Sequence, residues 1–173
     1  AIIIILAAIA IPNYLRMTER AKKARIASDM ASLATGLETF RTDWGAYPGA
    51  VGTAEAVDSD ATVIYKELSA DSTGTGVAVI NILNSTNILG ETGPIEYLKP
   101  ATLKSIVDPF TAAGGGTPGT FDDGHIYYLS DATTTVTANH WVLYAYTGIG
   151  TTPWMARYDS SSTIIESAGA PAT

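Results

Sequence analysis

The chain has 173 residues, which is enough for one domain with a hydrophobic core and an appendage. It contains no cysteine, which excludes disulfides, thiolate catalysis and zinc–thiolate sites. Its net charge of −7 argues against nucleic-acid binding through the globular part, because such binding depends on a basic surface.

The charge is divided unequally along the chain. Residues 1–25 carry a net charge of +4, whereas residues 26–173 carry −11. Opposite charges on two parts of one chain favour contacts between the basic part of one copy and the acidic part of another. The alternative is that the bases are solvated or face anionic lipid headgroups.

Ala1–Ile11 is apolar throughout and predicts the front end of a helix. A helix that crosses the hydrocarbon core of a bilayer needs about 20 apolar residues, and this run supplies about half of them. No initiator methionine and no basic stretch precede it, so it does not resemble an intact signal peptide. We expect a processed chain, or a sequence that begins inside the apolar segment.

One long helix is predicted over about residues 2–42. Pro12 removes one backbone hydrogen bond, which predicts a kink or local melting near Ile9–Pro12. Trp44-Gly45 followed by Pro48 predicts the end of the helix. Behind the front, apolar residues spaced four, three, four and three apart form a single stripe on the helix. They are Ile26, Met30, Leu33, Leu37 and Phe40.

The middle of the chain gives weaker signals. Ala54–Ala70 predicts one or two short helices, and Val77–Leu83 is either a strand or a short buried helix. Thr111–Asp123 is rich in glycine, threonine and proline and predicts an exposed loop. Its three consecutive glycines lack the Lys-Ser/Thr pair of a phosphate-binding loop.

The last fifty residues predict an antiparallel sheet, because alternating β-branched and aromatic runs are joined by short turns. A long helix with one apolar stripe packed on one face of this sheet gives an α+β fold. We predict a protruding apolar and basic helix segment at residues 1–25 and a globular α+β head at residues 26–173. The candidate strands are His125–Ser130, His140–Thr147, Trp154–Asp159 and Thr163–Glu166.

Neither catalysis nor a cofactor is predicted from the titratable residues. His125 and His140 are the only histidines, and a catalytic triad would also need a nucleophile and an orienting acid beside one of them. No Gly-x-Ser-x-Gly motif occurs, so we predict that the protein is not an enzyme.

A calcium site is the one metal site that the sequence suggests. Asp122 and Asp123, with Asp108 and Asp131, could supply the carboxylate and loop oxygens that Ca²⁺ prefers. The alternative is that they are solvated turn aspartates. Their spacing matches no EF-hand.

Several segments resemble the type IV pilin superfamily, which includes type IV pilins and the pseudopilins of type II secretion. The N-terminal helix is similar over Ile5–Tyr14. Asp43–Pro48 resembles the Asp-x-Gly-x-Tyr-Pro block of major pseudopilins, and Tyr97–Pro100 and Asp108–Phe110 resemble a later pseudopilin segment. The match covers roughly a third of the chain.

The chain departs from the family pattern in two ways. The pattern begins about ten residues before Ala1, with a methylated aromatic N-terminus and a glutamate, so neither role falls on a residue of this sequence. The C-terminal disulfide loop of many pilins is excluded because cysteine is absent.

The resemblance implies a structural subunit that polymerises into a helical, type IV pilus-like surface filament for adhesion, motility or DNA uptake. The alternative is a major pseudopilin that forms a periplasmic pseudopilus for type II secretion. Partners would be many copies of the same chain, the inner membrane before assembly, and the assembly machinery. No specific nucleic acid is expected, and Ca²⁺ is the only cofactor considered.

The predicted assembly residues belong to helix one. Small residues there permit close helix approach, and apolar residues pack between copies. The predicted helix core comprises Ile5, Leu6, Ala7, Ala8, Ile9, Ile11, Pro12 and Tyr14. The predicted charge contacts between subunits use Arg16, Arg20, Lys22 and Lys23. A different class, a secreted binding module or hydrolase, would need a cleft of convergent polar groups.

Overall fold

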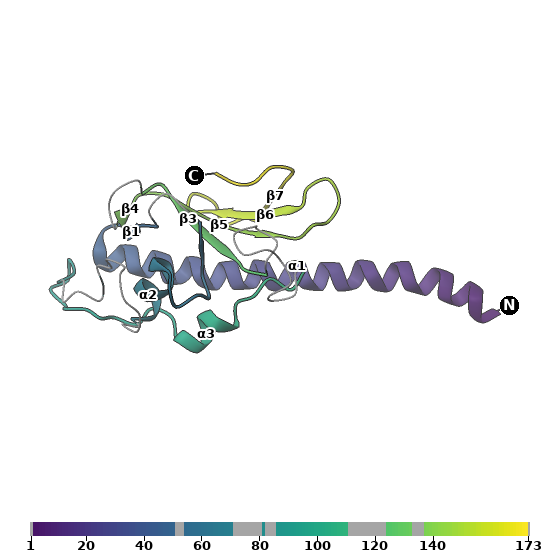
Figure 1. The fold of residues 1–173 in the computed structure, drawn as a ribbon, viewed down its shortest axis with the longest axis horizontal. Helices are drawn as coiled ribbons and strands as arrows, with labels where there is room; N and C mark the ends of the chain where they lie inside the picture. Colours follow the sequence, from purple (N-terminus) through teal and green to yellow (C-terminus); the bar gives the residue numbers. More distant parts are fainter. Residues whose placement is uncertain are drawn as a thin grey trace.

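A computed structural model of the chain describes residues 2–50, 54–70, 81, 86–110, 124–132 and 137–172. The helices there are α1 (Ile2–Trp44), α2 (Val63–Ser69) and α3 (Pro100–Ser105). The strands are β1 (Tyr47–Pro48), β2 (Glu55–Ala56), β3 (Tyr127–Ser130), β4 (Thr137–Ala138), β5 (Trp141–Tyr146), β6 (Trp154–Tyr158) and β7 (Ile165–Ser167). The predicted α+β fold, a long helix packed on an antiparallel sheet, is confirmed (Figure 1).

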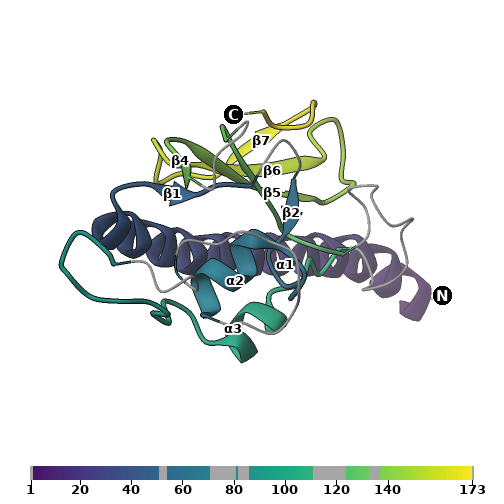
Figure 2. The same cartoon turned by 60° about the vertical axis from the view of Figure 1, so that its left-hand side comes forward.

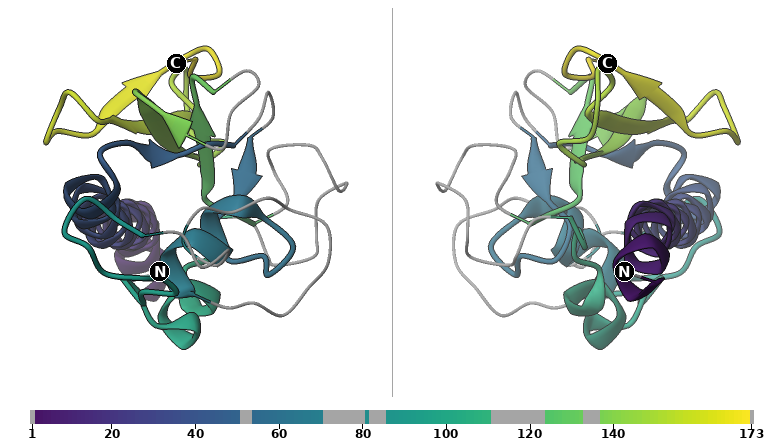
Figure 3. Two further views of the ribbon diagram at one scale, coloured as in Figure 1. Left: turned by 90° about the vertical axis from the view of Figure 1, so that its left-hand side faces the viewer. Right: turned by 90° about the vertical axis from the view of Figure 1, so that its right-hand side faces the viewer.

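The sheet has five antiparallel strands in the order β2-β3-β5-β6-β7, and β1 pairs separately with β4. The sheet lies on one side of α1, and α2 lies beside the edge strand β2, where Ile64 N donates to Glu55 Oε2; α3 lies farther from β6 and β7 (Figures 2 and 3). Strand β5 is central, with Leu143 opposite Tyr128 of β3 and Arg157 of β6. The four predicted strands correspond to β3, β5, β6 and β7, which begin and end within two residues of their predicted bounds, whereas β4 was not predicted.

The apolar stripe of α1 is the centre of the core. All five of its side chains, from Ile26 to Phe40, are fully buried. They pack with inward-facing sheet residues such as Tyr128, Leu143 and Met155. The alternate residues of the same strands, including Tyr127 and Tyr144, form a second cluster on the other face. Strand alternation therefore divides the sheet into two apolar faces.

A glycine lets a loop approach α1 closely. A Cβ atom at Gly36 would lie 2.9 Å from Cδ1 of Leu98, closer than real Cβ contacts allow. Glycine in a helix costs about 1 kcal/mol relative to alanine. At Gly36 the absence of a side chain leaves the space in which Leu98 packs against the core.

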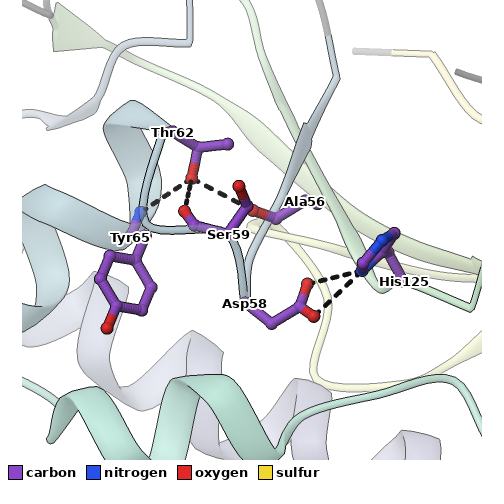
Figure 4. Close-up of polar contacts among 6 residues, drawn as sticks. All are labelled: Ala56, Asp58, Ser59, Thr62, Tyr65 and His125. Atoms are coloured by element: carbon purple, nitrogen blue, oxygen red, sulfur yellow. Dashed lines mark hydrogen bonds and ion pairs between the residues drawn. The ribbon is translucent and has the colours of Figure 1, made fainter. Parts of the chain in front are cut away.

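The prediction for Ala54–Ala70 is only partly right. Its first part forms strand β2, and only its second part forms helix α2. Thr62 separates the two, because its side chain accepts a hydrogen bond from Tyr65 N and donates to Ser59 O and Ala56 O (Figure 4). This N-cap starts the helix after the turn. Val77–Leu83 lies outside the described residues, except for the buried Asn81.

Asn81 joins two segments through its side-chain amide. Its Nδ2 donates to Glu67 O and Ile95 O, and its Oδ1 accepts from Ile95 N. Its backbone N also donates to Glu67 Oε2. A buried amide with these partners holds the segment at Ile95 against helix α2.

Candidate assembly surface on helix α1

The first turns of α1 project beyond the head (Figure 1), and the large apolar side chains that the structure describes there are exposed. Ile3 is 81% exposed, Ile9 is 70% exposed and Tyr14 is 68% exposed. Among the side chains that the structure describes on this helix, the first fully buried one is that of Ile26. We call the exposed set the apolar front. It comprises Ile3, Ile4, Leu6, Ile9, Ile11, Tyr14, Leu15 and Met17.

The apolar front is longer than the sequence predicted. Leu15 and Met17 belong to it, although the predicted helix core stopped at Tyr14 because the recognised motif ends there. The signal that could have found them is their position, since both are large apolar residues before the first base-rich turn. For Ile5 the structure describes the helical backbone.

A kink or local melting was predicted near Ile9–Pro12, and of these two alternatives local melting is wrong. Helix α1 is continuous through Pro12, and its axis curves in the first turns (Figure 1). Proline lacks the N–H that would bond the carbonyl of Ala8, so the helix keeps its shape there with one bond fewer. Pro12 and Ala8 are exposed, and Ala7 is half-buried. The two alanines leave room for a second helix to approach.

The four predicted charge-contact bases divide into two pairs. Lys22 Nζ lies 5.3 Å from the ring centre of Phe110, and Lys23 Nζ lies 2.8 Å from Glu166 Oε1 on β7. Both lysines therefore contact their own head. Arg16 and Arg20 are exposed, and neither has an ion pair within the described part of the chain. Arg16 and Arg20 are the bases left for a neighbouring copy, and the intersubunit contact itself stays a prediction.

Each histidine has an acidic partner. His125 Nδ1 lies 2.8 Å from Asp58 Oδ1 (Figure 4), and His140 Nδ1 lies 2.8 Å from Asp159 Oδ2. Among the residues that the structure describes, no serine or threonine hydroxyl is hydrogen-bonded to either ring. Each histidine therefore has the acid that a catalytic triad would need, but no nucleophile is hydrogen-bonded to its ring among the described residues. The absence of enzyme activity stays a prediction.

The calcium hypothesis stays a prediction. Asp122 and Asp123 lie outside the described residues. Asp131 Oδ1 accepts hydrogen bonds from the backbone N of Asn139 and of His140, and Asp108 Oδ1 accepts from Phe110 N. In the described ranges, no group of three acidic, histidine or cysteine residues is placed to hold a metal ion. Asp108 and Asp131 therefore act as turn-stabilising acceptors here.

Asp108 is a carboxylate strongly affected by burial. Burial raises the pKa of Asp108 to about 6, although the hydrogen bond from Phe110 N and the charge of Lys22 both oppose the rise. The folded protein then binds this proton more tightly than the unfolded chain. The stability associated with the protonated form is complete below the ordinary pKa of 3.8 and is lost as pH rises through about 6.

We expect Asp108→Asn to raise the free energy of unfolding by roughly 2–3 kcal/mol at pH 8, because it removes the cost of a buried charge. At pH 4 the same variant should match the parent protein. Urea denaturation at the two pH values, with EDTA present, measures the difference. Asp60→Asn, at an exposed surface pair with Lys104, is the control and should change little at either pH. An equal effect of Asp108→Asn at both pH values would contradict the assignment.

None of the described helices combines the length and the hydrophobicity that a membrane span requires. No protein-family model, no curated protein and no solved structure matches the chain. Only this chain's own residues therefore bear on assembly.

Proposed function

We propose that the protein is a structural subunit that polymerises into a helical, type IV pilus-like surface filament. The apolar front supports this proposal, since each of its side chains is between 54% and 81% exposed. Contiguous apolar surface on a protein marks a site of interaction with a partner or a membrane. A second copy of the same helix offers a surface of the same chemistry.

Burial of the apolar front supplies the free energy of assembly. In water, covering one large aliphatic side chain contributes about 1.5–3 kcal/mol. From lipid, the gain comes mainly from close packing, because lipid tails are themselves apolar. Ala7 and Ala8 favour that packing by allowing short distances between helix axes. We propose that subunits lie in the inner membrane before assembly and in an extracellular filament afterwards, brought there by assembly machinery.

The test is the physical state of the purified full chain after detergent is removed. We expect helical filaments by electron microscopy and rapidly sedimenting material by ultracentrifugation. Stable single particles in detergent-free buffer, with the front of α1 protected from proteases, would refute the proposal.

The second candidate is a major pseudopilin, and one contact favours it. Tyr97 OH donates to Asp43 Oδ2 at 2.9 Å and accepts from Trp44 Nε1 at 2.8 Å. Burial, followed by the hydrogen bond to Asp43, raises the pKa of Tyr97, so the phenol stays protonated. Two segments that resemble pseudopilins, Asp43–Pro48 and Tyr97–Pro100, are thereby joined. Long filaments shed from cells favour the pilus, and short assemblies retained in the periplasm favour the pseudopilus.

We expect the double change Arg16→Gln with Arg20→Gln to make filaments dissociate at lower salt. These two bases lie beside the apolar front, and the head of a neighbour carries the negative charge. Exposed ion pairs contribute about 0.2–1 kcal/mol each. Because the contact is repeated at every subunit of the polymer, the shift in the salt concentration of dissociation should be measurable. Sedimentation across a salt series measures it.

The control for that experiment is Lys99→Gln with Lys104→Gln, which removes the same charge from the N-cap and the last turn of α3 in the head. It should leave the dissociation midpoint unchanged. If both double variants shift the midpoint equally, the effect is one of net charge and the proposed contact is wrong.

A further inference from the structure

A pocket of about 350 Å³ opens on the head, away from the apolar front. Helix α1 contributes Thr35 and Glu38 to its lining, and the sheet contributes Trp141 and Arg157. The turn that follows β6 contributes Asp159 and Ser161. This volume is near the small end of ligand pockets, which range over roughly 300–1,000 Å³.

Two of the residues that line the pocket carry a buried donor without a partner in the described part of the chain. The Nε of Arg157 is buried and has no hydrogen-bond partner within the described part of the chain. The indole Nε1 of Trp141, a residue only 2% exposed, also has no hydrogen-bond partner there. A buried donor left unsatisfied costs about 1–3 kcal/mol, so two beside one pocket call for an explanation.

The acceptors of the pocket are held in position by other contacts. Glu38 Oε1 accepts a hydrogen bond from Tyr47 OH at 2.8 Å. Asp159 Oδ2 lies 2.8 Å from His140 Nδ1. Each carboxylate has further lone pairs, so each could still accept a bond from a ligand.

The pocket is lined by both positive and negative side chains, which indicates the chemical class of its ligand. An anion would meet Glu38 and Asp159, and a cation would meet Arg157. A hydroxyl group both donates and accepts, so it suits a guanidinium and a carboxylate together. We propose that this pocket binds a neutral sugar, with Arg157 donating to its oxygens and Glu38 and Asp159 accepting from its hydroxyls. This property is independent of polymerisation.

The test is an NMR titration of the tryptophan indole N–H signals in the labelled full chain. Dodecylphosphocholine micelles keep the chain in solution. This detergent is chosen because it carries no sugar that could compete with the probes. The probes are D-glucose, D-galactose and N-acetyl-D-glucosamine, added separately. We expect at least one to give a saturable shift of the Trp141 signal with a Kd of about 10 mM or tighter. The Trp44 signal, whose N–H is bonded to Tyr97 OH, should stay still.

Arg157→Gln should weaken that binding at least about tenfold, because a hydrogen bond from a charged group is lost. Lys99→Gln, an exposed base on another face of the head, should leave the affinity unchanged. An unaltered Trp44 signal in Arg157→Gln reports that the head is folded. No saturable shift with any of the three sugars overturns the proposal. So does a shift with sodium acetate alone, or full affinity in Arg157→Gln.

Discussion

Phe40→Ala is expected to lower the free energy of unfolding by about 3–5 kcal/mol, through lost burial and the cavity left behind. Phe40 is fully buried in the stripe of α1. Its ring lies 5.3 Å from that of Tyr97 and 6.1 Å from that of Trp44, centre to centre. Its loss therefore loosens the end of α1 from the segment at Tyr97. Domains of this kind are stable by about 5–15 kcal/mol, so the loss is a large fraction.

Urea denaturation followed by tryptophan fluorescence measures this effect. The matched control is Tyr14→Ala, which removes an aromatic side chain from the exposed part of the same helix. It should change the free energy of unfolding by no more than about 0.5 kcal/mol, as surface substitutions do. Equal losses in both variants would show that the stripe is not the core of the head.

Ile9→Glu is expected to abolish filaments while leaving the head folded. Ile9 lies within the apolar front and is 70% exposed in the single chain. A charge there should leave the head folded, because Ile9 is not part of the core of the head. In the filament the carboxylate would be buried without a partner, which costs several kcal/mol at every subunit. Electron microscopy after detergent removal should therefore show no polymer.

Ser32→Glu is the matched control, since it places the same charge at an exposed position of α1 beside the head. It should assemble like the parent protein. Circular dichroism and the urea midpoint should be unchanged in both variants, which separates assembly from folding. Normal filaments of Ile9→Glu would mean that the apolar front is not an interface between copies.

Local patterns predicted much of the fold. The helical spacing from Ile26 to Phe40 identified the buried stripe, and alternation identified the C-terminal strands, because both periods depend only on nearby residues. The start of α2 at Val63 was missed, although Thr62 is a usual N-cap residue. Strand β2 was missed for another reason. Two residues form it only because Tyr127 and Tyr128 of β3 lie opposite.

For the candidate assembly surface as well, the sequence predicts some features and not others. An apolar run beginning at the first residues is legible in the sequence, because no polar residue interrupts it before Pro12. The sequence does not indicate which bases remain available to contact a neighbouring copy. Lys23 is four residues from Glu19 in the chain, yet its partner is Glu166, far along the sequence on β7.

The sequence by itself determined the long helix, its buried stripe, the apolar front and the strands β3, β5, β6 and β7, because each is a property of neighbouring residues. Only the tertiary structure decided the pocket at Arg157 and the engagement of Lys23. Glu38 and Arg157 come together because α1 packs across the sheet beside the turn after β6. Residues so distant in the chain meet through packing of the whole core, which no local pattern records.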